Sequence, residues 1–176
     1  LRALLAEKPS RPVVFTANVT PMMIAAFADA GANHSCAVGS AAVYCWGLNG
    51  RRQLGDGTTL TRYRPEKVLG IPYLVQVSAG YQDTCGLTQD GVLWCWGADV
   101  GAQQVNTPLR FETLDGYGNL RCALTESGEA WCWVPGGALV RMQTHARFSK
   151  IDVAENHTCA LTFDGQVYCW GDNAYG

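Results

Sequence analysis

The chain has 176 residues, 48% of them hydrophobic, which is enough for a globular domain with a sizeable core and excludes a disordered chain. It has 13 Lys and Arg residues against 15 Asp and Glu residues, so the formal net charge is −2. With this charge, the sequence gives no electrostatic reason to expect binding to nucleic acid or to an anionic membrane surface. No apolar run reaches about 18 residues, so the sequence predicts no membrane-spanning helix. The start, Leu1 to Lys8, also lacks the long apolar segment of a signal peptide.

Residues 1–26 do not share the pattern of the rest of the chain. Pro9 and Pro12 end what reads as a short helical turn over residues 1–8. Residues 13–16, with the sequence Val-Val-Phe-Thr, read as a strand. A repeating pattern begins at Phe27, so we divide the chain into an irregular N-terminal segment, 1–26, and a repeat region, 27–176.

Four short hairpins recur in the repeat region, over residues 36–47, 85–97, 122–133 and 159–171, each with a cysteine on both strands. The first cysteines stand at positions 36, 85, 122 and 159, which gives intervals of 49, 37 and 37 residues. Strand-forming stretches such as 93–96, Leu-Trp-Cys-Trp, fill these segments, and no helical periodicity is sustained. About 37 residues accommodate four short strands and their turns, which is one blade of a β-propeller.

The hairpin over residues 85–97 predicts a local pairing of its cysteines. Its midpoint is Asp90, and a three-residue loop over residues 89–91 places Cys85 directly opposite Cys95. Gly91 then occupies the last loop position, which favours a left-handed backbone. Opposite Cα atoms on antiparallel strands lie about 4.5–5.5 Å apart, within the reach of a disulfide. The same count applies to the third and fourth hairpins.

Four local disulfides are therefore predicted, Cys36–Cys45, Cys85–Cys95, Cys122–Cys132 and Cys159–Cys169. The first hairpin is one residue shorter and has no Asp-Gly pair, so its loop is either Ser40-Ala41 or Gly39 to Ala42. Free structural thiols and a metal site are the alternatives, although the Cys-x2-Cys knuckles typical of structural zinc do not occur. Disulfides indicate an oxidising location, which means a secreted, cell-surface or periplasmic protein.

The motifs of these units resemble the regulator of chromosome condensation repeat. The second unit reads Ala79-Gly80-x3-Thr84-Cys85-x-Leu87, then an Asp90-Gly91 turn and Cys95-Trp96-Gly97. The most specific match follows the first hairpin, as Trp46-Gly47-Leu48-Asn49-Gly50-x2-Gln53-Leu54-Gly55-Asp56-Gly57-Thr58. Cysteines on both hairpin strands are similar to those of exported bacterial members and extracellular receptor members. The resemblance covers about residues 27–176 and implies an all-β propeller, usually of seven blades, of which about 3.5–4 are present.

The chain departs from the family pattern after the second and third hairpins. Residues 98–108 and 134–144 replace the Gln-Leu-Gly-Asp-Gly segment with short stretches that we expect to be irregular. Four blades alone would form an open half-ring with unpaired strand edges. We therefore expect either a fragment of a longer propeller or closure by self-association or by another subunit.

Two residue types recur at fixed places in the units. A tryptophan follows the second cysteine of each pair, at Trp46, Trp96, Trp133 and Trp170. We expect these side chains to anchor each blade against its neighbour, with an aromatic ligand surface as the alternative. His34 and His157 both lie two residues before a first cysteine. Because a repeat would not normally duplicate a catalytic histidine, we expect each to hydrogen-bond a turn backbone in its blade.

The sequence contains no motif for a nucleophile, a zinc hydrolase or a phosphate-binding loop. We therefore expect no enzymatic activity, no cofactor and no metal. Residues 50–66 account for the 12 extra residues of the first interval, and long loops on a rigid scaffold tend to carry binding residues. A partner-binding role is assigned to the basic and aromatic residues of this segment and the lysine after it, Arg51, Arg52, Arg62, Tyr63, Arg64 and Lys67. An ordinary connector with solvated arginines is the alternative.

The sequence favours a non-catalytic repeat scaffold that binds a protein or glycan partner outside the cytoplasm, through loops on one propeller face. One alternative, implied by the family's founding member, is a guanine-nucleotide exchange factor for a small GTPase. Exchange needs a projecting wedge, and none is apparent in the sequence. A propeller enzyme with an unrecognised site is the second alternative, supported by fold analogy alone.

Overall fold

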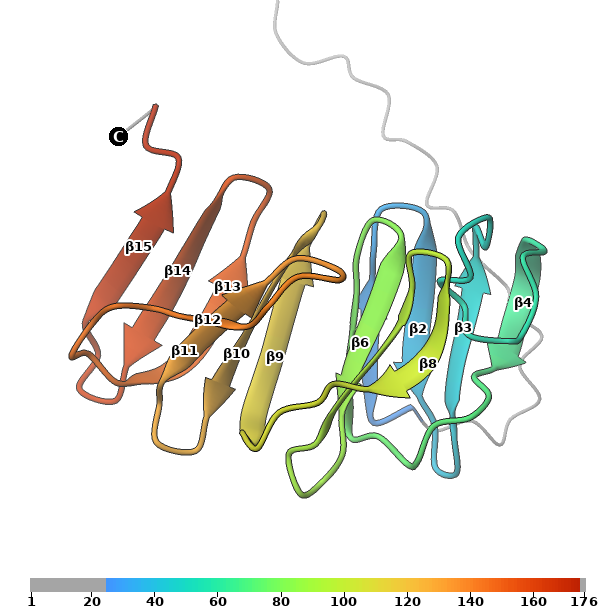
Figure 1. Cartoon of the computed structure of the whole chain (residues 1–176), viewed down its shortest axis with the longest axis horizontal. Helices are drawn as coiled ribbons and strands as arrows, with labels where there is room; N and C mark the ends of the chain where they lie inside the picture. Colours follow the sequence, from blue (N-terminus) through green and yellow to red (C-terminus); the bar gives the residue numbers. More distant parts are fainter. Residues whose placement is uncertain (1–24, 175–176) are drawn as a thin grey trace, which may run out of the picture.

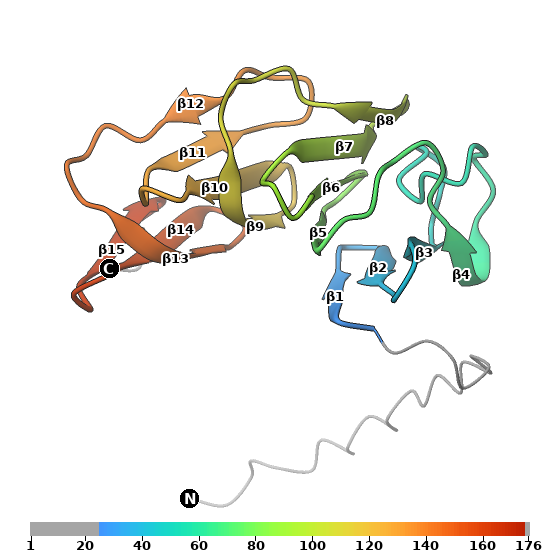
Figure 2. The ribbon, with the colours of Figure 1, turned by 90° about the horizontal axis from the view of Figure 1, so that it is seen from below.

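The computed structural model describes residues 25–174, and this part of the chain consists of strands and turns without a helix. Accordingly, no helix in this range is long and apolar enough to cross a membrane. The strands form four antiparallel sheets that lie side by side in an arc (Figures 1 and 2). The prediction of an all-β fold is confirmed. The helical turn and the strand predicted within residues 1–16 lie outside the described residues.

Each sheet is a simple meander whose neighbouring strands follow chain order. Sheet 1 contains β1 (Phe27–Ala30), β2 (His34–Val38), β3 (Val43–Gly47) and β4 (Arg62–Lys67). Sheet 2 contains β5 (Gln76–Ala79), β6 (Asp83–Leu87), β7 (Leu93–Gly97) and β8 (Val100–Gln104). Sheet 3 contains β9 (Phe111–Tyr117), β10 (Leu120–Thr125), β11 (Ala130–Trp133) and β12 (Val140–Arg141). Sheet 4 contains β13 (Phe148–Val153), β14 (His157–Thr162) and β15 (Val167–Gly171).

The sheets are arranged radially, like the blades of a propeller. Their first strands contact one another in order, β1 with β5, β5 with β9 and β9 with β13. The last strands, β4, β8 and β12, lie on the outer side of the arc (Figure 2). The prediction that residues 98–108 and 134–144 are irregular was wrong for residues 100–104 and 140–141, which form β8 and β12, and holds for the rest of both segments. The strand β8 pairs with β7 in an antiparallel hairpin. A two-residue turn at Ala98 and Asp99, both with positive φ, is long enough to reverse the chain between these two strands.

The turns of the hairpins agree with the predicted loop lengths. In sheet 2, the Gly91 N–H donates to the Thr88 carbonyl at 3.0 Å, and the Thr88 N–H donates to the Val92 carbonyl at 3.1 Å. Gly91 has a φ of 77°, the left-handed conformation that the third loop position requires. In the shorter first hairpin, the Gly39 N–H donates to the Ala42 carbonyl at 2.9 Å, so its loop is Ser40-Ala41.

Each sheet also contains one disulfide between its second and third strands. The bonded pairs are Cys36–Cys45, Cys85–Cys95, Cys122–Cys132 and Cys159–Cys169. Both cysteines of every pair occupy opposite positions in the strand register. All eight cysteines of the sequence are thereby paired within single blades.

The hydrophobic core lies between adjacent sheets as three clusters. The first joins residues of sheets 1 and 2, namely Cys36, Val38, Val43, Cys45, Leu54, Val68, Leu74, Val77 and Trp96. The second joins sheets 2 and 3 through Cys85, Leu87, Leu93, Phe111, Leu114, Ala123 and Trp133. The third joins sheets 3 and 4 through Leu124, Ala130, Phe148 and Ala160, with Trp170 packed against it. The tryptophans of sheets 2, 3 and 4 therefore all pack toward the preceding sheet.

Hydrogen bonds between the first strands connect successive sheets. The Asp29 carboxylate accepts the backbone N–H of Ala79 at 2.7 Å, and the Asp115 carboxylate accepts that of Val153 at 2.6 Å. Asp29 and Asp115 are equivalent, since each lies opposite the first cysteine of its blade. Burial raises the pKa of Asp115 even though backbone N–H groups donate to it.

Candidate binding surfaces

Polar side chains that precede the first cysteines connect neighbouring blades. His34 Nε2 lies 2.8 Å from the Thr84 hydroxyl, and both groups are buried between sheets 1 and 2. At the same positions between sheets 2 and 3, Arg121 donates to the Asp83 carboxylate at 2.5 Å. In both interfaces, the side chain two residues before the first cysteine of one blade forms a hydrogen bond with the side chain one residue before the first cysteine of the next blade.

The role of His34 differs from the predicted one. Its ring reaches across to the neighbouring sheet instead of bonding a turn backbone in its own blade, so that prediction was wrong. His34 is only 3% exposed. Burial, together with the nearby positive charge of Arg121, lowers the pKa of His34 from 6.5 to about 4. It is therefore neutral near pH 7 and serves as a hydrogen-bonding element of the blade interface.

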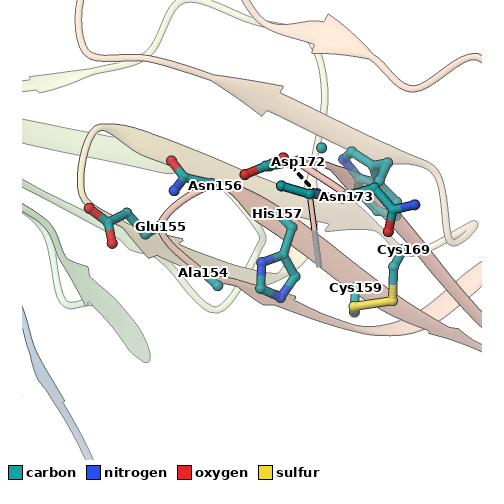
Figure 3. A pocket seen from close by; sticks show the side chains of 11 residues that line it. Ala154, Glu155, Asn156, His157, Cys159, Cys169, Asp172 and Asn173 are labelled. Atoms are coloured by element: carbon teal, nitrogen blue, oxygen red, sulfur yellow. Dashed lines mark hydrogen bonds between the residues drawn. A yellow bond between two sulfur atoms is a disulfide. The ribbon is translucent and has the colours of Figure 1, made fainter. Parts of the chain in front are cut away.

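His157, which occupies the equivalent position in sheet 4, lies on an open surface (Figure 3). It lines a depression of about 780 Å³ beside the Cys159–Cys169 disulfide, together with Glu155, Asn156 and Asn173. The corresponding face of sheet 1 is covered by sheet 2, as the contact between His34 and Thr84 shows. The depression thus lies on the face of sheet 4 that corresponds to the face of sheet 1 covered by sheet 2.

The long connector over residues 48–61 is held in shape by buried polar groups. Asn49 is fully buried, and its side-chain carbonyl accepts the Leu54 N–H at 3.0 Å. The Asn49 amide donates to Asp56 at 2.9 Å, and Arg62 Nε donates to the same carboxylate at 2.7 Å. Burial raises the pKa of Asp56, but hydrogen bonds from Arg62, Thr58 and Asn49 outweigh it and hold the pKa below its ordinary value.

The middle of this connector fills the groove between sheets 1 and 2. The Gln53 carbonyl accepts the Trp96 indole N–H at 3.0 Å and the Thr84 hydroxyl at 2.9 Å. Leu54 is fully buried in the core cluster of that interface. Gly55, with a φ of 66°, lies so close to Trp96 and Val68 that a Cβ atom would be within 3.0 Å of both. The motif that carries the family resemblance is therefore a piece of the blade interface.

The six residues expected to bind a partner have different surroundings. Arg51 forms an ion pair with Asp99, and Arg62 is bound by Asp56. Arg52, Arg64 and Lys67 are exposed and form no ion pair with any residue in the range 25–174. Tyr63, the second residue of the outer strand β4, is 93% exposed. Tyr63, Arg64 and Lys67 are thus the exposed members on β4, whereas Arg51 and Arg62 have intramolecular partners.

A second surface was not anticipated from the sequence. A cleft of about 450 Å³ lies between sheets 2 and 3, lined by the Cys85 and Cys95 disulfide, Val105, Trp133 and Leu139 among others. The amide side chains of Gln103, Gln104 and Asn106 also line it. The only feature of the sequence that indicates this cleft is the interval after the second hairpin, which is 12 residues shorter than the first interval. The interval length does not show where the additional residues of the first unit lie in space.

Comparison with known proteins agrees with this architecture. The regulator of chromosome condensation (RCC1) repeat matches residues 40–87 and 148–176. The human E3 ubiquitin-protein ligase HERC2 is 34% identical over 100 residues, which is 50% of this chain and 2% of that protein. The mouse regulator of chromosome condensation is 39% identical over 74 residues, which is 40% of this chain and 18% of that protein.

Solved structures show the same fold at low sequence identity. Human WBSCR16 superimposes with a TM-score of 0.74 at 19% identity, over 82% of this chain and 46% of that chain. Yeast RCC1 (Prp20) bound to Kap60 gives 0.68 at 16% identity, over 80% and 42%. The ectodomain of the Physcomitrella patens receptor kinase CR4 gives 0.58 at 23% identity, over 82% and 40%. The chain thus spans less than half the length of each of these structures.

The radial sheets and the structural matches define a partial β-propeller. The two sequence matches give its particular type over residues 40–87 and 148–176, which are similar to the regulator of chromosome condensation repeat, and each described blade contains one disulfide.

Proposed function

We propose that the chain is a non-catalytic repeat scaffold that binds a protein partner outside the cytoplasm, through the exposed surface of Tyr63, Arg64 and Lys67 on β4. A glycan is the alternative ligand. The observation that carries this proposal is the 93% exposure of Tyr63 between basic neighbours. Tyrosine and arginine contribute disproportionately to the binding energy of protein interfaces.

The location of β4 supports this role. It is the outer strand of sheet 1, and among the described strands it pairs with β3 alone. Pro65 in its middle has no N–H to offer, which is typical of edge strands that avoid pairing with other sheets. A partner would therefore contact side chains of β4 rather than extend the sheet. The four disulfides support a location outside the cytoplasm, since such bonds persist in oxidising compartments.

One of the proteins with a similar fold has known protein partners. One solved structure holds yeast RCC1 (Prp20) bound to Kap60, and a second is of Saccharomyces cerevisiae Prp20p, which has binding properties to Gsp1p and histones. These partners belong to those proteins, and at 16% identity the likeness shows the fold alone.

The test is a comparison of the partners captured by three forms of the immobilised chain. The triple variant Tyr63→Ser, Arg64→Ser, Lys67→Ser is expected to lose partners from an extracellular fraction that the unmodified chain retains. Its melting temperature should stay within about 2 °C, because exposed substitutions rarely change stability by more than about 0.5 kcal/mol. Arg110→Ala, which removes an exposed charge near sheet 3, is the matched control and should retain them. An identical set of captured proteins for all three forms would refute the proposal.

A further inference from the structure

The cleft between sheets 2 and 3 has a filled counterpart elsewhere in the same chain. Its walls include Cys85, Cys95 and Val105 from sheet 2 and Trp133 from sheet 3. The equivalent residues between sheets 1 and 2 are Cys36, Cys45, Val68 and Trp96, which all belong to one buried cluster. The equivalence of the valines follows from the backbone, because Val68 and Val105 each donate to the carbonyl at the start of the third strand, Val43 or Leu93, at 2.9 Å. The two grooves therefore share the same walls.

The contents of the two grooves differ because the connectors differ in length. Residues 48–61 join β3 to β4, whereas only residues 98 and 99 join β7 to β8. In the first groove, the long connector delivers Gln53 and Leu54, and Leu54 becomes fully buried. The two-residue turn after β7 has no segment to deliver. The second groove consequently stays open as a cleft of about 450 Å³.

The open cleft also presents hydrogen-bonding groups without partners. The Trp96 indole N–H donates to the Gln53 carbonyl at 3.0 Å. For the indole N–H of Trp133, the equivalent side chain, no acceptor is found within residues 25–174. Three of the residues that line the cleft, Gln103, Gln104 and Asn106, likewise have side-chain amides without a hydrogen bond within that range. Amide groups of this kind are suited to pairing with the N–H and carbonyl groups of a peptide backbone.

We propose that the cleft binds an extended segment of a partner protein, in the same manner as the first groove binds the chain's own connector. An aliphatic side chain of the segment takes the place of Leu54, beside the Cys85–Cys95 disulfide, Val105 and Trp133. The carbonyl of the preceding residue accepts the Trp133 indole N–H. This site is separate from the β4 surface, and it does not depend on the function proposed for that surface.

A peptide with the sequence of residues 49–58 is the direct probe, because this segment already fits the equivalent groove. It is added to the full disulfide-bonded chain, and the indole N–H signals of the six tryptophans are followed by NMR. The Trp133 signal, assigned with Trp133→Phe, is expected to shift in a saturable way. A peptide with Asp in place of its leucine should bind at least tenfold more weakly, because its charge would be buried against apolar walls.

Variants of the protein test the same contacts with a fluorescent peptide and anisotropy. Trp133→Phe removes the donor and should weaken binding roughly fivefold, the effect of one typical hydrogen bond. Trp170→Phe, at the same repeat position outside the cleft, should bind as the unmodified chain does. Val105→Asp should abolish binding, whereas the triple variant on β4 should not affect it.

Two results would overturn the proposal. One is the absence of any saturable shift at millimolar peptide. The other is binding that the Asp-substituted peptide and Trp133→Phe both leave unchanged. Because the peptide substitution acts on unmodified protein, a folding defect of Val105→Asp does not obscure the outcome.

Discussion

Asp83 and Arg121 form an ion pair between sheets 2 and 3 in which the two side chains are 5% and 0% exposed. Burial raises the pKa of Asp83 against the opposing effect of Arg121, and burial lowers the pKa of Arg121. The pair stands where His34 and Thr84 meet between sheets 1 and 2. The interface between sheets 2 and 3 thus contains a charged pair at the two positions where the interface between sheets 1 and 2 contains a neutral pair.

The first prediction concerns the replacement of the Asp83–Arg121 pair by a His–Thr pair like that of the first interface. Arg121→Thr alone should destabilise the protein by about 3–5 kcal/mol, because it leaves a buried carboxyl group without its partner. The double variant Asp83→His, Arg121→Thr rebuilds the neutral pair of the first interface and should recover more than half of that loss. Denaturant unfolding under non-reducing conditions measures both values. Losses that simply add in the double variant would show that the two positions do not act as a pair.

The second prediction concerns pH. The folded pKa of His34, about 4, lies below the unfolded value of 6.5, so the unfolded chain binds the proton more readily. The stability that this histidine contributes is complete above pH 6.5, decreases as the pH falls toward 4 and is then lost. The shift corresponds to a loss of about 3 kcal/mol as an upper bound.

The comparison with His34→Gln isolates this effect from the carboxylates that titrate in the same range. Glutamine keeps a group that hydrogen-bonds the Thr84 hydroxyl but does not titrate. The difference in unfolding free energy between the two proteins should therefore change between pH 7 and pH 4, in favour of the variant at low pH. A constant difference across this range would contradict the assignment.

The sequence predicted the hairpins and their disulfides because local chemistry determines them. An Asp-Gly pair sets the turn around Gly91, and the loop length then sets which cysteines face each other. The outer strands β8 and β12 were not predicted, because β12 has two residues and neither strand has an alternating apolar pattern. The partner of His34 was also missed, since Thr84 lies 50 residues away and belongs to the next blade. The cleft was missed because its walls come from segments of sheets 2 and 3 that are distant in the sequence.

The third prediction concerns the order in which the disulfides are reduced. Cys36 and Cys45 are both fully buried, whereas Cys169 of the fourth bridge is exposed. Thiol attack requires access to a sulfur atom, so a mild reductant in native buffer should open Cys159–Cys169 first. Timed alkylation followed by mass spectrometry gives the order. Earlier alkylation of Cys36 or Cys45 would mean that the first interface opens more readily than the packing indicates.

Alkylation without a reductant tests whether the protein comes from an oxidising compartment. Protein taken from its source without reductant and treated with an alkylating agent under denaturing conditions should show all eight cysteines unmodified. Eight free thiols would instead favour a reducing compartment and the alternative of an intracellular exchange factor.

The last prediction concerns the segment that fills the first groove. Leu54→Ala should cost about 2–5 kcal/mol, because it removes a fully buried side chain from the cluster that joins sheets 1 and 2. Leu60→Ala is the matched control, since Leu60 lies in the same connector but is 61% exposed, and it should change stability by less than about 0.5 kcal/mol. Thermal and denaturant unfolding of both variants, with disulfides intact, measure the difference. Equal effects of the two substitutions would mean that the connector only covers the groove and that Leu54 does not stabilise the interface between sheets 1 and 2.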